Sequence, residues 1–266
     1  MNQGDNHPLA GCGVVVTRPL HQAQHMVDLI AQAGGTPFLF PVLEIIEAKD
    51  LGPFNHLIDR LEQFDIAIFI SPNAVNKALN LIRARRELPT NLMIAAIGKG
   101  SRKELNQLGV HEVVAPTDNF DSEALLALPE MQQVAGKKIV IFRGEGGREV
   151  LGNELTVRGA TIEYAECYRR HRPDSDARDL LYHWARNELH AIVVTSGEGL
   201  HNLYDMVGKL GRQWLKKTPV FVPHERLVEV AHSLGMGEVY GTRPGDEGLL
   251  EGVIEWYRNR KTTAKN

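Results

Sequence analysis

The stretch Val14–Arg18 (VVVTR) decides the fold, because it returns about 125 residues later as Ile139–Arg143 (IVIFR). Two further pairs recur in the same order and at nearly the same spacing: Ala67–Ser71 with Ile192–Ser196, and Met93–Gly98 with Pro219–Pro223. A repeat of this length is far longer than the unit of a solenoid. It therefore predicts two similar domains.

Within each copy, short apolar runs alternate with segments of helical period, which predict helices over residues 22–33 and 73–82 among others. Strands that are apolar throughout and separated by helices indicate a parallel sheet covered on both faces. The predicted fold class is α/β, with two similar doubly wound parallel-sheet domains. Ligands of such sheets bind outside the carboxyl ends of the strands.

The composition is that of a folded globular protein. The 266 residues include 30 basic and 33 acidic side chains, and this balance lacks the basic excess of a nucleic-acid or anionic-membrane binder. The apolar runs are too short to span a bilayer, and Met1–Ala10 lacks the apolar core of a signal peptide. Two cysteines, Cys12 and Cys167, cannot form a disulfide framework or a multi-thiolate metal site. We expect a cytoplasmic protein with no metal, nucleic-acid partner or membrane partner.

Two arginines, Arg18 and Arg143, occupy repeat-equivalent positions at strand ends. Each could form a salt bridge between segments or receive a carboxylate in bidentate fashion. The glycine-rich stretch Gly144–Arg148 (GEGGR) follows a strand and opens a helix. Its backbone N–H groups could hold a carboxylate or phosphate, and the alternative is a tight glycine turn.

Hydroxyl side chains at strand ends have a structural interpretation beside a functional one. Ser71, directly before a proline, is suited to cap the helix that follows. Ser101 and Ser196 allow the same interpretation.

Seven segments, spread over about residues 11–257, occur in an order that is similar to one known family: Val16–Pro19 (VTRP), Ile70–Val75 (ISPNAV), Ala96–Gly98 (AIG) with Ser101, Phe142–Glu149 (FRGEGGRE), Cys167–Arg170 (CYRR), Val194–Ser196 (VTS) and His224–Leu227 (HERL). The chain thereby resembles the uroporphyrinogen-III synthases, which cyclise hydroxymethylbilane in tetrapyrrole (heme) biosynthesis. In that family threonine often stands in the turn that ends here at Ser101, and Ser or Thr commonly stands at the position of His224.

The resemblance implies a particular domain arrangement. Residues 8–44 plus 170–262 would form a discontinuous first domain, and residues 47–167 an inserted second domain. A two-stranded connection would join the domains, with the active site in the cleft between them. The resemblance also implies a cyclising hydro-lyase that needs no cofactor.

The implied reaction removes the terminal hydroxyl of a linear tetrapyrrole rich in carboxylates, and inverts its last pyrrole ring. Tyr168 matches the family's tyrosine at the end of the connecting strand, and we expect it to assist departure of the hydroxyl. The alternative is a strand aromatic whose hydroxyl caps a loop. The expected substrate-binding residues are Arg18, Ser71, Ser101, Arg143, Gly144, Arg148, Thr195, Ser196 and His224.

The resemblance implies few partners. Hydroxymethylbilane would be the small-molecule partner of a monomer, with at most transient contact with the preceding pathway enzyme. An alternative function is a non-catalytic, two-lobed ligand-binding or regulatory module of the same pathway. Resolving the product isomers formed from hydroxymethylbilane would separate the two hypotheses.

Overall fold

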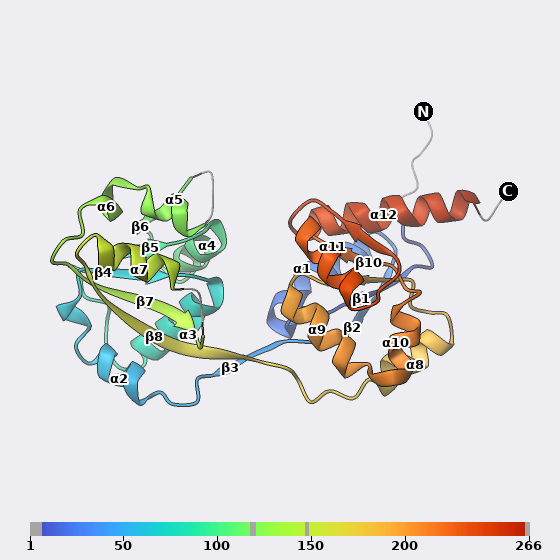
Figure 1. The fold of residues 1–266 in the computed structure, drawn as a ribbon, viewed down its shortest axis with the longest axis horizontal. Helices are drawn as coiled ribbons and strands as arrows, with labels where there is room; N and C mark the ends of the chain where they lie inside the picture. Colours follow the sequence, from blue (N-terminus) through green and yellow to red (C-terminus); the bar gives the residue numbers. More distant parts are fainter. Residues whose placement is uncertain (1–6, 118–120, 147–148, 264–266) are drawn as a thin grey trace. The chain divides into compact units, whose positions relative to one another are not determined.

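The computed structural model describes residues 7–117, 121–146 and 149–263. The chain divides into two compact units (Figure 1). Unit 1 comprises Met1–Glu44 and His171–Asn266, and unit 2 comprises Ile45–Arg170. Each unit contains its own sheet, and the predicted α/β class is confirmed.

Unit 1 contains a five-stranded parallel sheet in the order β11-β10-β9-β1-β2. Its strands are β1 (Gly13–Val16), β2 (Thr36–Leu39), β9 (Ala191–Val193), β10 (Val220–Val222) and β11 (Val239–Gly241). Its helices are α1 (Leu20–Gln32), α8 (Arg178–Ala185), α9 (Gly197–Met206), α10 (Gly208–Leu215), α11 (Glu225–Ser233) and α12 (Asp246–Thr263).

Helices cover both faces of the unit 1 sheet. Successive strand residues point to opposite faces, so an apolar strand gives the sheet two apolar faces to bury. Val15 and Ile192 belong to an apolar core shared with α8 to α11. Val16 and Val193 belong to a second core, on the other face, that α1 and α12 complete. The sheet is therefore doubly wound, as the uninterrupted apolar character of β1, β9 and β10 predicts.

Unit 2 contains a six-stranded sheet in the order β3-β8-β7-β4-β5-β6. Its strands are β3 (Glu44–Glu47), β4 (Ile66–Phe69), β5 (Met93–Ala96), β6 (Val113–Val114), β7 (Lys138–Gly144) and β8 (Thr161–His171). Its helices are α2 (Gly52–Ile58), a short 3-10 helix (Leu61–Gln63), α3 (Pro72–Arg83), α4 (Lys99–Gln107), α5 (Ser122–Leu126), α6 (Pro129–Gln132) and α7 (Val150–Val157).

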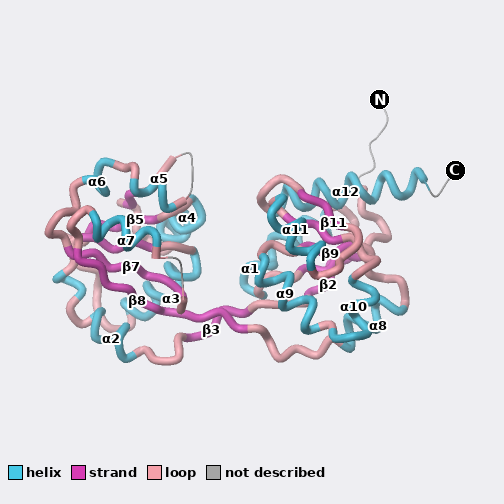
Figure 2. The backbone as a smooth tube through the Cα atoms, viewed as in Figure 1, coloured by secondary structure: helices cyan, strands magenta, loops and turns pink. Residues whose placement is uncertain are grey.

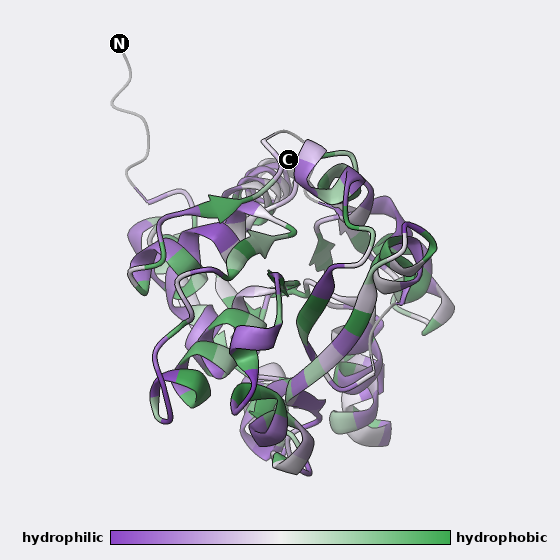
Figure 3. Ribbon diagram, turned by 90° about the vertical axis from the view of Figure 1, so that its left-hand side faces the viewer, coloured by the Kyte–Doolittle hydropathy of each residue, from purple (hydrophilic) through white to green (hydrophobic). Residues whose placement is uncertain are grey.

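The unit 2 sheet also has two apolar cores. One contains Phe69 and Phe142, whose rings stack 4.7 Å apart, together with residues of α2, α3 and α4. The other contains Ile68 and Ile141 and is covered by α5, α6 and α7. Colouring by hydropathy shows several short strands as hydrophobic, whereas the helices carry residues of both kinds (Figure 3).

The repeat in the sequence appears as the same spatial order of strands in both units. The repeat pairs β1 with β7, β4 with β9 and β5 with β10. The order β2-β1-β9-β10-β11 in unit 1 thus corresponds to β8-β7-β4-β5-β6 in unit 2. In unit 2 the helix after β4 and the helix after β7 cover opposite faces, so the boundary between β4 and β7 is a topological switch point.

Two strands carry the chain between the units. The chain enters unit 2 through β3 and leaves it through β8, and these strands are hydrogen-bonded neighbours at one edge of the unit 2 sheet (Figure 2). Within the described ranges, no helix combines the length and apolar character needed to cross a membrane.

Candidate functional site

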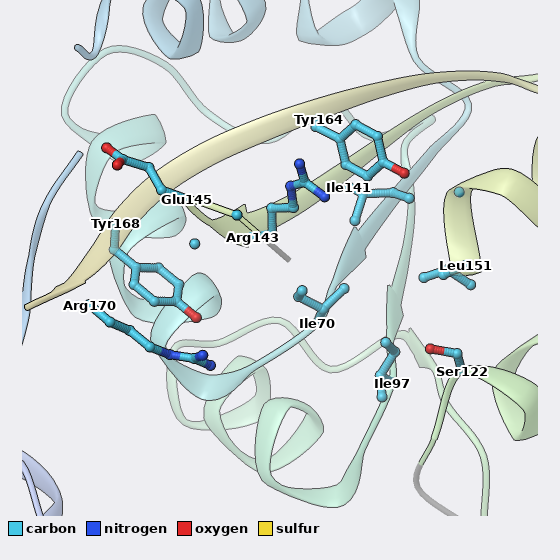
Figure 4. Close-up of a pocket in the computed structure, with 13 residues that line it drawn as sticks. Ile70, Ile97, Ser122, Ile141, Arg143, Glu145, Leu151, Tyr164, Tyr168 and Arg170 are labelled. Carbon is cyan, nitrogen blue, oxygen red and sulfur yellow. The ribbon is translucent and has the colours of Figure 1, made fainter. Parts of the chain in front are cut away.

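A pocket of about 290 Å³ lies at the switch point of unit 2 (Figure 4). Its apolar wall comes from Ile70 and Ile97, which follow β4 and β5, together with Ile141 and Leu151. Its polar lining consists of Ser122, Arg143, Glu145, Tyr164, Tyr168 and Arg170, and three glycines, Gly144, Gly146 and Gly152, complete it. The pocket thus lies where doubly wound sheets bind ligands.

A β-bulge directs Tyr168 into this pocket. Arg143 of β7 pairs with Glu166 of β8, but the next residue, Gly144, pairs with Tyr168, so that Cys167 is the extra residue. A bulge makes two successive side chains turn to the same side of the strand. Cys167 and Tyr168 accordingly both pack in the core that contains Phe142.

Tyr168 is 2% exposed, and its Oη lies 3.1 Å from Oγ of Ser71. Ser71 is the N-cap of α3, and its Oγ accepts a hydrogen bond from the backbone N–H of Ala74 at 3.1 Å. The capping interpretation of Ser71 is correct. The same oxygen also holds the phenol, so the cap serves to orient Tyr168.

The place of Gly144 beside Tyr168 requires glycine. A Cβ at Gly144 would lie 2.6 Å from Cε2 and 2.7 Å from Cζ of the Tyr168 ring. The ring fits over the end of β7 only because this residue has no side chain. Thus the glycine supports the geometry of the pocket, whatever its backbone binds.

Arg143 is the buried charge of the pocket, with 7% exposure. Its Nη2 donates to Oε1 of Glu166 at 3.1 Å, and its guanidinium lies over the ring of Tyr164, 3.8 Å from the centroid. Its other two nitrogens, Nε and Nη1, are buried and make no hydrogen bond to any residue that the structure describes. Buried donors are normally satisfied. An anionic ligand in the pocket would satisfy them.

The thiol next to Tyr168 is not a nucleophile. Burial raises the pKa of Cys167 to about 12. The thiolate is the reactive form of cysteine, and this side chain remains a neutral thiol near neutral pH. Its Sγ contacts the backbone carbonyl of Arg143 at 3.3 Å, which is a packing role in the bulge.

The unit 1 candidates lie at the carboxyl ends of other strands. Arg18 follows β1, and its Nη2 lies 2.6 Å from Oδ1 of Asp246, so the salt-bridge interpretation holds for it. Ser196 caps α9 by accepting from the N–H of Gly199, and Thr195 before it is half-buried. His224 is the exposed N-cap residue of α11 and makes no side-chain cap bond.

Two further candidates differ from the expectation. Ser101 is buried within the first turn of α4, whose N-cap is Gly98, so the capping interpretation of Ser101 is wrong. A hydroxyl can lie inside a first turn without capping it, because the cap is the residue before the helix. Arg148 lies outside the described residues.

Tyr164 and Glu166 also line or border the pocket, although no sequence motif singled them out, and Arg170 of the segment Cys167–Arg170 lines it as well. A usable signal exists for the first two. Residues of one strand alternate between its faces, so residues 162, 164 and 166 share the face that meets Arg143 on the paired strand. No group of three or more His, Cys, Asp or Glu side chains suited to a metal ion occurs among the described residues.

Comparison with known families identifies sequence relatives over most of the chain. A family model for uroporphyrinogen-III synthase HemD matches residues 24–251. The uroporphyrinogen-III synthase of Salmonella typhimurium LT2 is 33% identical over 239 residues, which cover 89% of this chain and 97% of that protein. The uroporphyrinogen-III synthase of Escherichia coli K12 is 32% identical with the same coverage.

Solved structures share the fold. A mutant uroporphyrinogen III synthase from the extremely thermophilic bacterium Thermus thermophilus has a TM-score of 0.61 at 17% identity, over 94% of this chain and 99% of that one. A uroporphyrinogen-III synthetase from Helicobacter pylori 26695 has a TM-score of 0.60 at 15% identity, over 92% and 99% of the two chains. At these identities the likeness bears on the architecture, two α/β units with parallel sheets.

Proposed function

The chain belongs to the uroporphyrinogen-III synthase family, and from this premise we propose that the unit 2 pocket binds a carboxylate-bearing part of hydroxymethylbilane during its cyclisation. The enzyme is a cyclising lyase of tetrapyrrole biosynthesis. Its reaction expels the terminal hydroxyl of the linear tetrapyrrole as water, inverts the last pyrrole ring and closes the macrocycle. The match over most of the chain favours this activity over a non-catalytic binding module.

The observation that carries the proposal is the guanidinium of Arg143. Two of its nitrogens are buried and unsatisfied by the described residues, next to an apolar wall that suits a pyrrole ring. A substrate carboxylate is the natural acceptor for these donors, because charge-assisted hydrogen bonds from arginine are short and strong. Arg143 therefore contributes to substrate binding rather than to the chemical step.

Tyr168 supplies the hydroxyl of the pocket. In our proposal its phenol gives a proton to the departing hydroxyl, which leaves as water, so that a delocalised cation forms on the substrate and Tyr168 becomes a phenolate. The phenolate regains a proton when ring closure releases one from the substrate. Proton management of this kind needs no enzyme nucleophile. Ser71, 3.1 Å away, orients the phenol before substrate arrives.

The direct test follows turnover of enzymatically generated hydroxymethylbilane and separates the product isomers. Arg143→Gln should raise KM about tenfold or more with little change in kcat, because a charge-assisted contact contributes about 1.5–3 kcal/mol. The matched control is Arg85→Gln, which removes the same charge from an exposed ion pair with Asp59. An unchanged KM for Arg143→Gln would refute the carboxylate contact.

The remaining expectations are proposals as well. Arg18, Ser101, Arg148, Thr195, Ser196 and His224 are proposed as further substrate contacts. For Arg18, binding a carboxylate requires competition with Asp246, which holds its guanidinium. We also propose that residues 8–44 plus 170–262 form one domain and residues 47–167 the other, and that the enzyme is a cytoplasmic monomer. Analytical sedimentation at the protein concentration of the activity assay tests whether the enzyme is a monomer.

A further inference from the structure

Tyr164 lies on the face of β8 that meets Arg143, with its ring under the guanidinium (Figure 4). The distance of 3.8 Å from Cζ of Arg143 to the ring centroid is a close stacking contact. Burial raises the pKa of the Tyr164 phenol, and the nearby charge of Arg143 opposes this shift. The ring therefore stays neutral near neutral pH and offers its negative face to the cation.

The Tyr164 ring lies directly against Gly152 of α7. A Cβ at Gly152 of α7 would lie 2.1 Å from Oη and 2.9 Å from Cζ of Tyr164. No larger residue at Gly152 could coexist with the ring where it lies. Glycine in a helix interior is unfavourable relative to alanine. Its presence in α7 gives the Tyr164 ring the room that it occupies.

We propose that Tyr164 is a positioning residue for the substrate carboxylate, which acts by holding the guanidinium of Arg143 with Nε and Nη1 free for the ligand. This inference rests on the proposed role of Arg143 in substrate binding. Glu166 fixes only Nη2, so by itself it leaves the guanidinium plane free to rotate about that hydrogen bond. The ring of Tyr164 restricts this rotation, because it holds Cζ of the guanidinium 3.8 Å from its centroid.

Two substitutions separate the ring from its hydroxyl. Tyr164→Phe keeps the face under Arg143, so its KM should stay within about twofold of the unchanged enzyme. Tyr164→Leu removes the face, and its KM should rise about tenfold, equivalent to about 1.4 kcal/mol. In both variants kcat should change little, because positioning acts on binding. Equal KM values for the Phe and Leu variants would overturn the proposal.

A double-mutant cycle tests whether Tyr164 acts through Arg143. In an Arg143→Gln background, Tyr164→Leu should raise KM no further, whereas a purely structural role would make the two effects multiply. If Arg143→Gln raises KM and Tyr164→Leu multiplies that rise, positioning is wrong and the proposed function stands. If Arg143→Gln itself leaves KM unchanged, the proposed function fails and the positioning inference fails with it.

Gly152→Ala perturbs the ring from α7 and leaves the β8 side chains unchanged; because Gly152 itself lines the pocket, the double variant below separates displacement of the ring from filling of the pocket. The added methyl must displace the Tyr164 ring, so KM should rise about as much as in Tyr164→Leu. Combining Gly152→Ala with Tyr164→Phe deletes the closest contact and should partly restore KM. A Gly152→Ala variant with normal KM would overturn the proposal, as would a double variant no better than Gly152→Ala alone.

Discussion

Replacing Tyr168 by phenylalanine removes one oxygen and leaves the buried ring in place. This oxygen has a hydrogen-bond partner in Oγ of Ser71, at 3.1 Å. Loss of a neutral hydrogen bond lowers the free energy of unfolding by about 1 kcal/mol. If Tyr168 is the general acid, the chemical step should slow by about 10²- to 10⁴-fold, which is far more than the change in stability predicts.

Ser71→Ala is the matched control for this effect. It deletes the same hydrogen bond from the other side and also removes the helix cap at Ala74, which costs about 0.5–2 kcal/mol. Ser71→Ala should therefore be at least as destabilised as Tyr168→Phe. Because it retains the phenol, it should keep at least about tenfold more turnover than Tyr168→Phe.

The assay measures thermal stability, single-turnover rate and the ratio of product isomers for both variants. Hydroxymethylbilane also closes without enzyme to the non-inverted isomer, so slow catalysis by Tyr168→Phe should shift the product mixture towards that isomer. The catalytic role of Tyr168 is refuted if the Phe variant is folded and has a normal rate and isomer ratio.

Three further outcomes follow from specific contacts. Gly144→Ala forces the Tyr168 ring to move from a contact of 2.6 Å, so it should cost about 1–3 kcal/mol of stability and slow turnover, both measured on one preparation. Thr218→Val removes the oxygen that accepts a hydrogen bond from the buried Nε1–H of Trp184 at 3.0 Å. Denaturant unfolding should show a free energy of unfolding lower by about 1–3 kcal/mol, and an unchanged value would contradict a stabilising role of this bond. Burial lowers the pKa of His190, so the unfolded chain binds a proton at a pH where the folded chain does not. The free energy of unfolding should therefore fall as pH drops below about 6.5. His190→Gln should make that fall shallower between about pH 6.5 and 5, and an identical pH profile would contradict the assignment.

The fold could be predicted from sequence because its signals are redundant. The repeat starting at Val14 and Ile139 gives two copies of one unit, and the apolar strands in each copy require cover on both faces. The predicted helices over residues 22–33 and 73–82 correspond to α1 and α3, within two residues at each end. Such agreement is expected where helical period and caps coincide, as at Ser71 before Pro72.

The site was less predictable, because strand-end position does not determine what a side chain contacts. Arg18 and Arg143 are equivalent in the repeat, and both form ion pairs, with Asp246 and Glu166 respectively. Of the two, only Arg143 also has buried nitrogens without a described partner. That difference depends on Tyr164 and on the other residues that line the pocket. These residues come from several separate segments of the chain, which the sequence alone does not bring together.

The bulge at Cys167 shows why one residue can decide the chemistry of a site. In a regular strand Tyr164, Glu166 and Tyr168 would share a face, and the phenol of Tyr168 would project beside the charge of Arg143. The extra residue turns Tyr168 to the opposite face, where Ser71 holds it among apolar side chains. In the proposed function, the two faces then supply different groups to one pocket: the guanidinium of Arg143 for a substrate carboxylate and the hydroxyl of Tyr168 for the departing group. Gly144, the residue after Arg143, lies against the Tyr168 ring, and Arg143 and Tyr168 line the same pocket at the end of β7.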